Sequence, residues 1–270
     1  LSKIMQTSTT AASNLGMGLG GFVSGGLIMG SVVGQGVATW NLGSYLLKED
    51  RKYFQMLRIK KMLSLLKKYK KLPIYNLPNA FIEVLRLSII NIVIARLFTA
   101  SVLGQFSLAW RMLQVPMALV GNSLSQVFYQ KISSASQSDL NLIVRKFIFR
   151  TSLSILPVFI MIYLFSEDVF IIIFGETWQL AGEAASVMTP WLYLTFLVQP
   201  LSAIFVVINR QEVMLIFSII NIIFILGAIT LFHELGFIAL LNLITIIMSV
   251  MLFIYIGIVL QYTNKVKLKV

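Results

Sequence analysis

Long apolar runs dominate this chain and limit it to structures that are stable in a lipid bilayer. An α-helix needs about 20 predominantly apolar residues to cross a hydrocarbon core of about 30 Å. Eight segments of suitable length follow one another along the sequence, at 1–20, 22–47, 74–98, 101–131, 144–165, 179–208, 213–232 and 235–262. Backbone polar groups in lipid must be satisfied internally. We therefore expect an all-α integral membrane protein with about eight transmembrane helices.

The composition excludes most other classes. Apolar residues make up 58% of the chain and charged residues 12%, and the mean hydropathy is +0.88. A soluble domain carries about 25% charged residues. The chain has no cysteine, and its single histidine, His233, cannot form a metal cluster alone. A Walker-type glycine loop is absent, and the predicted outer connections are too short to present a catalytic apparatus. We expect no enzyme activity, no cofactor and no metal.

Lysine and arginine alternate along the chain in a pattern that predicts its orientation. They are concentrated at 48–71, 131–150, Arg210 and 265–269, whereas the connections between these segments contain acidic residues instead. Positively charged loops are retained in the cytoplasm. We therefore expect a multi-pass membrane protein with a cytoplasmic C-terminus. The net charge of +12 then reflects membrane topology, not nucleic-acid binding.

Two further segments each allow two interpretations. Residues 59–72 are amphipathic and basic, which suits either a helix lying on the inner leaflet or a solvated cytoplasmic linker. In the second predicted helix, Gly26, Gly30 and Gly34 share one face. Small residues on one face favour close helix packing, and a moving hinge is the alternative.

Charges within the predicted helices are few and therefore informative. An arginine at the bilayer centre costs about 2.5–3.5 kcal/mol on insertion scales, so it needs a partner or an aqueous cavity. At 1.5 Å per residue, Arg86 lies about 18 Å and Arg111 about 15 Å into their helices, both near the midplane. Glu83 and Arg86 have the i, i+3 spacing of a local ion pair. The alternative is that Arg86 binds an anionic ligand and Glu83 a coupling ion.

Arg111 has no carboxylate within helical reach, and its planar fork suits phosphate. Gln114, Asn122 and Ser125 fall on the same side of this helix as Arg111. A polar stripe in a membrane helix is expected to line a cavity. The candidate substrate-binding residues are therefore Arg111, Arg86, Asn122 and Gln114, with Glu83 as the candidate ion-coupling residue.

Ordered motifs over most of 73–210 carry a resemblance to a known family. They are LPNA at 77–80, GQFSLAWRMLQVP at 104–116, LVGNSLSQVFYQK at 119–131, FGETW at 174–178, AG at 181–182, PW at 190–191 and PLS at 200–202. In these motifs the sequence resembles polysaccharide flippases, the O-antigen or repeat-unit translocases of the multidrug/oligosaccharidyl-lipid/polysaccharide exporter superfamily. Arg111 falls on an arginine often found in this family, whereas Arg86 matches no motif as clearly.

The resemblance implies a two-lobed transporter in which two six-helix halves surround a central cavity. Residues 1–47 would be the last two helices of the N-terminal lobe, and 48–73 a basic cytoplasmic inter-lobe linker. Residues 74–262 would form the whole C-terminal lobe, and 263–270 a basic cytoplasmic tail. Four further helices are expected upstream of residue 1. Such proteins pass polyprenyl-diphosphate-linked oligosaccharides to the outer leaflet of the inner (plasma) membrane by alternating access, driven by a proton or sodium gradient. The resemblance therefore implies that this chain is a protein of the inner (plasma) membrane.

Three other functions compete with a flippase. A drug or cation exporter of the same superfamily would prefer cavity carboxylates, and Glu83 is the one carboxylate in the middle of a predicted helix. A membrane enzyme of polysaccharide assembly is disfavoured by the short outer connections. A structural subunit would not need an unpaired arginine near the midplane. The expected partners are the bilayer, a lipid-linked oligosaccharide and a coupling ion, with no nucleic acid.

Overall fold

The computed structural model describes residues 2–19, 26–49, 59–136 and 139–267, which are predominantly α-helical. The chain divides into two compact units, Leu1–Tyr69 and Lys70–Val270. Each unit is described separately below. Parts of two predicted segments, residues 50–58 of the linker and 268–270 of the tail, lie outside the described residues. The assignment of residues to lobes, linker and tail stays a prediction.

The first unit contains α1 (Ser2–Leu19), α2 (Gly26–Glu49) and α4 (Ile59–Lys68). Helix α1 packs along α2. A Cβ atom added to Gly30 would collide with the Asn14 side chain, and one added to Gly34 would collide with the Thr10 side chain. The two glycines therefore permit close helix packing, as the first interpretation predicted. The surroundings of Gly26 lie outside what the structure describes.

Helix α4 is strongly amphipathic and buries none of its residues. Its lysines are exposed, and so are apolar side chains such as Leu63 and Leu66. A short helix with an uncovered apolar face is typical of a segment that lies on a membrane surface. Both interpretations of this segment stay open.

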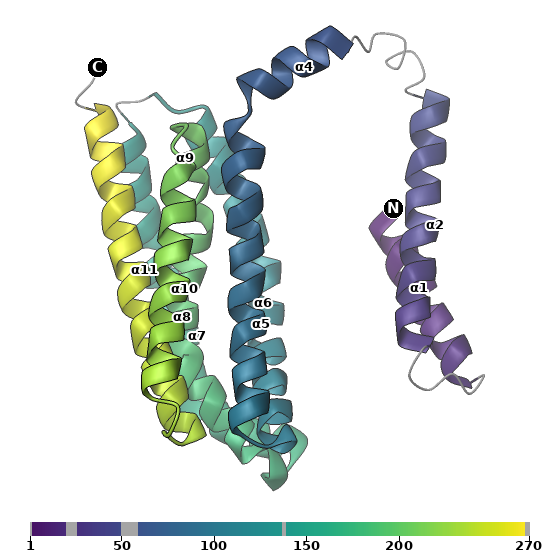
Figure 1. The fold of residues 1–270 in the computed structure, drawn as a ribbon, viewed down its shortest axis with the longest axis vertical. Coiled ribbons are helices and arrows are strands. Elements are labelled where there is room, and N and C mark those ends of the chain that lie inside the picture. Colours follow the sequence, from purple (N-terminus) through teal and green to yellow (C-terminus); the bar gives the residue numbers. More distant parts are fainter. Residues whose placement is uncertain (1, 20–25, 50–58, 137–138, 268–270) are drawn as a thin grey trace. The chain divides into compact units, whose positions relative to one another are not determined.

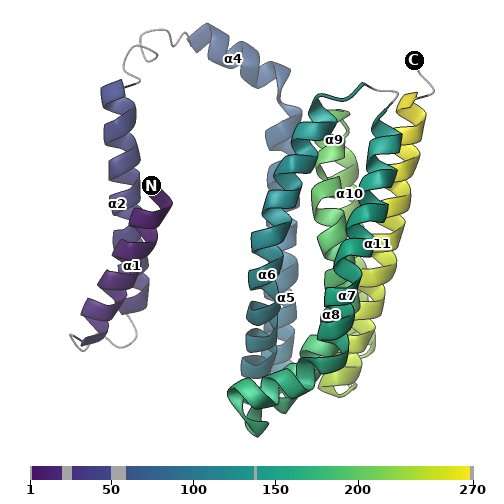
Figure 2. The ribbon, with the colours of Figure 1, turned by 180° about the vertical axis from the view of Figure 1, so that it is seen from behind.

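The second unit is a bundle of long helices that run up and down (Figures 1 and 2). It comprises α5 (Leu77–Leu97), α6 (Ala100–Ser133), α7 (Leu140–Phe174), α8 (Gln179–Leu201), the short α9 (Ala203–Val207), α10 (Glu212–Leu231) and α11 (Phe237–Lys267). Helix α8 is its core, because α6, α7 and α11 all pack along it. Small residues on α8, including Ala181, Gly182 and Ala185, are buried and allow this close packing.

Four stretches of the described chain are long and apolar enough to cross a membrane. They are Leu140–Phe174, Glu176–Val207, Glu212–Leu231 and Phe237–Lys265. The chain is therefore a multi-pass membrane protein with an all-helical fold. Other long helices carry polar or charged residues in their interiors, such as Arg86 in α5 and Arg111 in α6. The expected count of about eight membrane helices stays a prediction.

The predicted outer connection at 166–177 is wrong over most of its length, because α7 continues to Phe174. Its polar start does not end the helix, since the Ser166 hydroxyl donates to the carbonyl oxygen of Gly182 at 2.9 Å. Helix α7 ends at Gly175, whose φ of 94° suits a residue without a side chain. The predicted helix at 179–208 is present as α8 and α9, with an interruption at Ser202, two residues after Pro200.

Candidate functional site

The polar face of α5 places a carboxylate beside a guanidinium group. Asn79, Glu83 and Arg86 recur at helical spacing with Ile90 and Ile94, which anchor this face in the core. Arg86 Nη2 lies 2.6 Å from Glu83 Oε2, and Arg86 Nη1 donates to Glu83 Oε1 at 3.2 Å. The local ion pair suggested by the i, i+3 spacing is thus present, with the paired geometry that makes arginine–carboxylate contacts strong. The substrate role of Arg86 stays a prediction.

This ion pair lines a polar cavity of about 300 Å³ between α5, α8, α10 and α11. Ser218 of α10 contacts both polar residues of α5 opposite it. Its hydroxyl lies 2.8 Å from Asn79 Oδ1 and 3.0 Å from Glu83 Oε1, so it donates to one or the other. The Arg86 side chain is only 16% exposed, and its Nε is buried without a hydrogen-bond partner among the described residues, whereas the Glu83 side chain is 40% exposed. The carboxylate is therefore the part of the pair that a small cation or proton can reach.

The contribution of α10 to this cavity was not predicted from the sequence. Ser218 and Asn221 lie one turn apart on an otherwise very apolar helix, and both are buried. The amide of Asn221 has no hydrogen-bond partner in the described part of the chain. Two polar residues one turn apart in an otherwise apolar helix are a sequence signal that this helix face contacts polar groups of a neighbouring helix.

The polar stripe predicted on α6 lies mostly on its exposed face. Arg111 and Asn122 are exposed and Gln114 is half-buried, whereas Leu113 and Met117 bury the opposite side. Asn122 Oδ1 accepts a hydrogen bond from Gln199 Nε2 at 3.5 Å, and Gln199 also lines the polar cavity. Arg111 does not line that cavity. The structure thus brings Glu83 and Arg86 together and connects Asn122 to their cavity, but it leaves Arg111 separate from Arg86.

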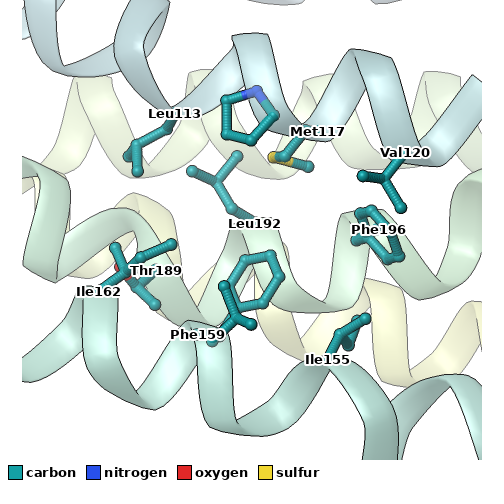
Figure 3. A pocket seen from close by; sticks show the side chains of 11 residues that line it. Leu113, Met117, Val120, Ile155, Phe159, Ile162, Thr189, Leu192 and Phe196 are labelled. Carbon is teal, nitrogen blue, oxygen red and sulfur yellow. The ribbon is translucent and has the colours of Figure 1, made fainter.

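A second cavity, of about 170 Å³, is formed between α6, α7 and α8 (Figure 3). Leu113 and Met117 approach it from α6, Phe159 from α7 and Leu192 from α8. Thr189 also lines it, and its hydroxyl donates to the Ala185 carbonyl of its own helix at 2.8 Å. This cavity therefore presents hydrocarbon and suits an apolar chain, not a sugar or a phosphate.

Motif residues join the start of α8 to the neighbouring helices α6 and α7. The backbone N–H of Ala181 donates to Gln105 Oε1 at 3.0 Å, which satisfies one of the free donors at this helix end. A Cβ atom on Gly182 would lie 2.6 Å from the Glu167 Cα atom, so α7 and α8 touch through their backbones here. These residues thus have a structural role in joining α6, α7 and α8.

The comparison with protein families identifies the group to which the chain belongs. The family model described as polysaccharide biosynthesis protein matches residues 1–182, about two-thirds of the chain. The matched region contains Glu83, Arg86, Arg111, Gln114 and Asn122. No curated protein and no solved structure matches the chain. On the strength of the family match, the chain belongs to the polysaccharide biosynthesis protein family.

Proposed function

We propose that this protein translocates polyprenyl-diphosphate-linked oligosaccharide repeat units across the bacterial inner membrane by alternating access. Its family assigns it to polysaccharide assembly, and its helices make it a multi-pass membrane protein. Repeat units built on a lipid in the cytoplasm must cross the bilayer before they reach the cell surface. Moving a lipid-linked sugar needs a membrane cavity with an anion-binding group, and it needs no catalytic apparatus. That the protein is not an enzyme is part of this proposal.

The observation that carries the proposal is the exposed, unpaired Arg111. It lies about 16 Å from the start of α6, counted from Ala100 at 1.5 Å per residue. Within the described residues it has no ion pair or hydrogen bond, while Gln114 and Asn122 extend the same polar face. Leaving such a side chain in hydrocarbon costs about 2.5–3.5 kcal/mol. We infer that this face meets water and the diphosphate, whose oxygens accept paired charge-assisted hydrogen bonds from the guanidinium.

The Glu83–Arg86 pair suits a coupling role better than a primary substrate site. Arg86 already donates two contacts to Glu83, so an anion must displace the carboxylate to bind it. A proton or sodium ion on Glu83 weakens its attraction to Arg86 and frees the guanidinium. Ion binding at the polar cavity would thereby change the charge available to the substrate. The same pairing disfavours the cation-exporter alternative, because Arg86 neutralises the carboxylate that such a transporter would use.

The distribution of the basic residues sets the membrane orientation that we propose. The C-terminus, the basic linker and the α6–α7 connection would lie in the cytoplasm, and the start of α8 would lie outside. The substrate then enters from the inner leaflet and leaves to the outer one.

Substitution of Arg111 tests the proposal in cells that lack their own flippase. Because hydrogen bonds to charged groups contribute about 1.5–3 kcal/mol, Arg111→Ala should lower surface polysaccharide at least about tenfold. Arg111→Lys keeps the charge but loses the fork, so it should impair export less. Arg96→Ala is the matched control, because Arg96 is an exposed arginine in the last turn of α5. Normal polysaccharide from well-expressed Arg111→Ala protein would contradict the proposal.

A further inference from the structure

A seam between α6 and α7 contains two different cavities in succession. Each helix packs along α8, and they make few contacts with each other. Deep in the seam lies the apolar cavity of Figure 3. Nearer the helix ends, the same two helices enclose a cavity of about 280 Å³ that is lined by Lys131, Lys146 and Arg150 together with apolar side chains. One end of the seam is thus cationic and the other is hydrocarbon.

The three cations of this cavity have no acidic partner in the described part of the chain. None of the ion pairs there includes them, and all three side chains belong to exposed residues. Asp139 is the acidic residue nearest in sequence, but it does not line the cavity and accepts a hydrogen bond from Ser136 at 2.6 Å. The cavity therefore offers uncompensated positive charge beside exposed apolar residues such as Val127 and Leu142.

The spacing of the two cavities matches one leaflet of a bilayer. Helix α7 has no charged residue between Arg150 and Glu167, a distance of about 25 Å along the helix. A hydrocarbon core is about 30 Å thick, which puts Arg150 at its boundary. Phe159, which lines the apolar cavity, lies about 14 Å deeper along α7. The cationic cavity is then at headgroup depth and the apolar cavity near the midplane.

The seam lies on a different face of α6 from the polar stripe. Lys131 is at i+20 from Arg111, which is about 200° around the helix at 3.6 residues per turn. Leu113, Met117 and Val120, which line the apolar cavity, also lie on this side. A molecule in the seam would therefore be separate from the proposed substrate face and in contact with the surrounding bilayer.

We propose that this seam binds an anionic membrane phospholipid. Its phosphate accepts hydrogen bonds from Lys131, Lys146 and Arg150, and one acyl chain follows the seam into the apolar cavity. Basic pockets between membrane helices at this depth are suited to anionic headgroups. Among the described residues that line the apolar cavity, the one hydroxyl is already hydrogen-bonded, so no free polar group excludes an acyl chain. This inference does not depend on the proposed transport function.

Native mass spectrometry of the purified protein with phosphatidylglycerol or phosphatidylcholine tests the headgroup site. Each basic residue near an anionic lipid contributes about 1 kcal/mol, so Arg150→Gln should lower phosphatidylglycerol retention about fivefold. Arg145→Gln is the matched control, because Arg145 is exposed on the same helix but does not line the cavity. Equal losses in the two variants, or equal retention of the two lipids by the unaltered protein, would overturn the proposal.

A second pair of variants tests the acyl-chain site while the charges stay intact. Val120→Trp should fill the apolar cavity and lower phosphatidylglycerol retention, whereas Leu119→Trp, an exposed neighbour outside the cavity, should not. Unchanged retention in Val120→Trp would show that no chain occupies the cavity. Displacement of the lipid by pyrophosphate alone would indicate a free-anion site. Preferential displacement by a polyprenyl diphosphate would assign the seam to the substrate. Each of these three outcomes contradicts the phospholipid proposal.

Discussion

The close contact between α7 and α8 at Gly182 predicts that a larger side chain at this position lowers the stability of the protein. In Gly182→Ala the new Cβ would lie 2.6 Å from Glu167 Cα, 2.9 Å from the Ser166 carbonyl oxygen and 3.1 Å from Glu167 N. All three atoms are backbone, so no side chain can rotate away and the helices must separate. Overpacking of this kind costs about 1–3 kcal/mol. Separation also weakens the bond from Ser166 Oγ to the Gly182 carbonyl, a contribution of about 1 kcal/mol.

The opposing contribution is the helix propensity of alanine, which favours the variant by about 1 kcal/mol at most. We therefore expect Gly182→Ala to lower the free energy of unfolding by about 1–3 kcal/mol. Gly227→Ala is the matched control, because Gly227 lies inside α10 and an added Cβ meets nothing within 4 Å. It should stabilise the protein by up to about 1 kcal/mol. Reversible unfolding in mixed micelles measures both variants, and equal stability of the two would refute the reasoning.

Two further predictions concern the ion pair and the orientation. Glu83→Gln should destabilise the protein by about 2 kcal/mol, because it leaves the largely buried Arg86 without its charged partner, and Arg86→Gln added to it should recover part of this loss. Additive effects in this double-mutant cycle would show that the pair contributes no coupling energy. For orientation, a cysteine at Gly175 should react with an impermeant thiol reagent in intact cells, and one at Ser64 should not. The reverse labelling pattern would overturn the orientation inferred from the basic residues.

The sequence predicted where most helices lie, because apolar runs and the turn residues between them are local signals. It failed at the end of α7, where Ser166 and the acidic residues after it have the composition of a loop. There the hydroxyl of Ser166 bonds to α8, and Phe170 is buried a turn later, so the helix continues to Phe174. Both contacts depend on residues distant in the sequence, which local patterns do not reveal.

In the candidate site, too, local contacts could be inferred from the sequence, whereas contacts between distant segments could not. The i, i+3 spacing of Glu83 and Arg86 suggested their ion pair as one of two interpretations, and the structure contains this pair. The hydrogen bond from Ser218 links residues 135 positions apart, and helix periodicity cannot predict which helix of a bundle packs against α5. The polar face of α6 was predicted from its periodicity, whereas its link to α8 through Gln199 appears only in the structure.

Transfer of a lipid-linked oligosaccharide between leaflets tests the central claim most directly. Purified protein would be reconstituted into liposomes with a fluorescent polyprenyl-diphosphate oligosaccharide, and an impermeant quencher would report the fraction in the outer leaflet under an imposed proton or sodium gradient. We predict that the unaltered protein and Arg96→Ala speed the exchange, and that Arg111→Ala leaves it close to the rate of protein-free liposomes. Exchange by the unaltered protein no faster than in protein-free liposomes under either gradient, or full activity of Arg111→Ala, would contradict the account.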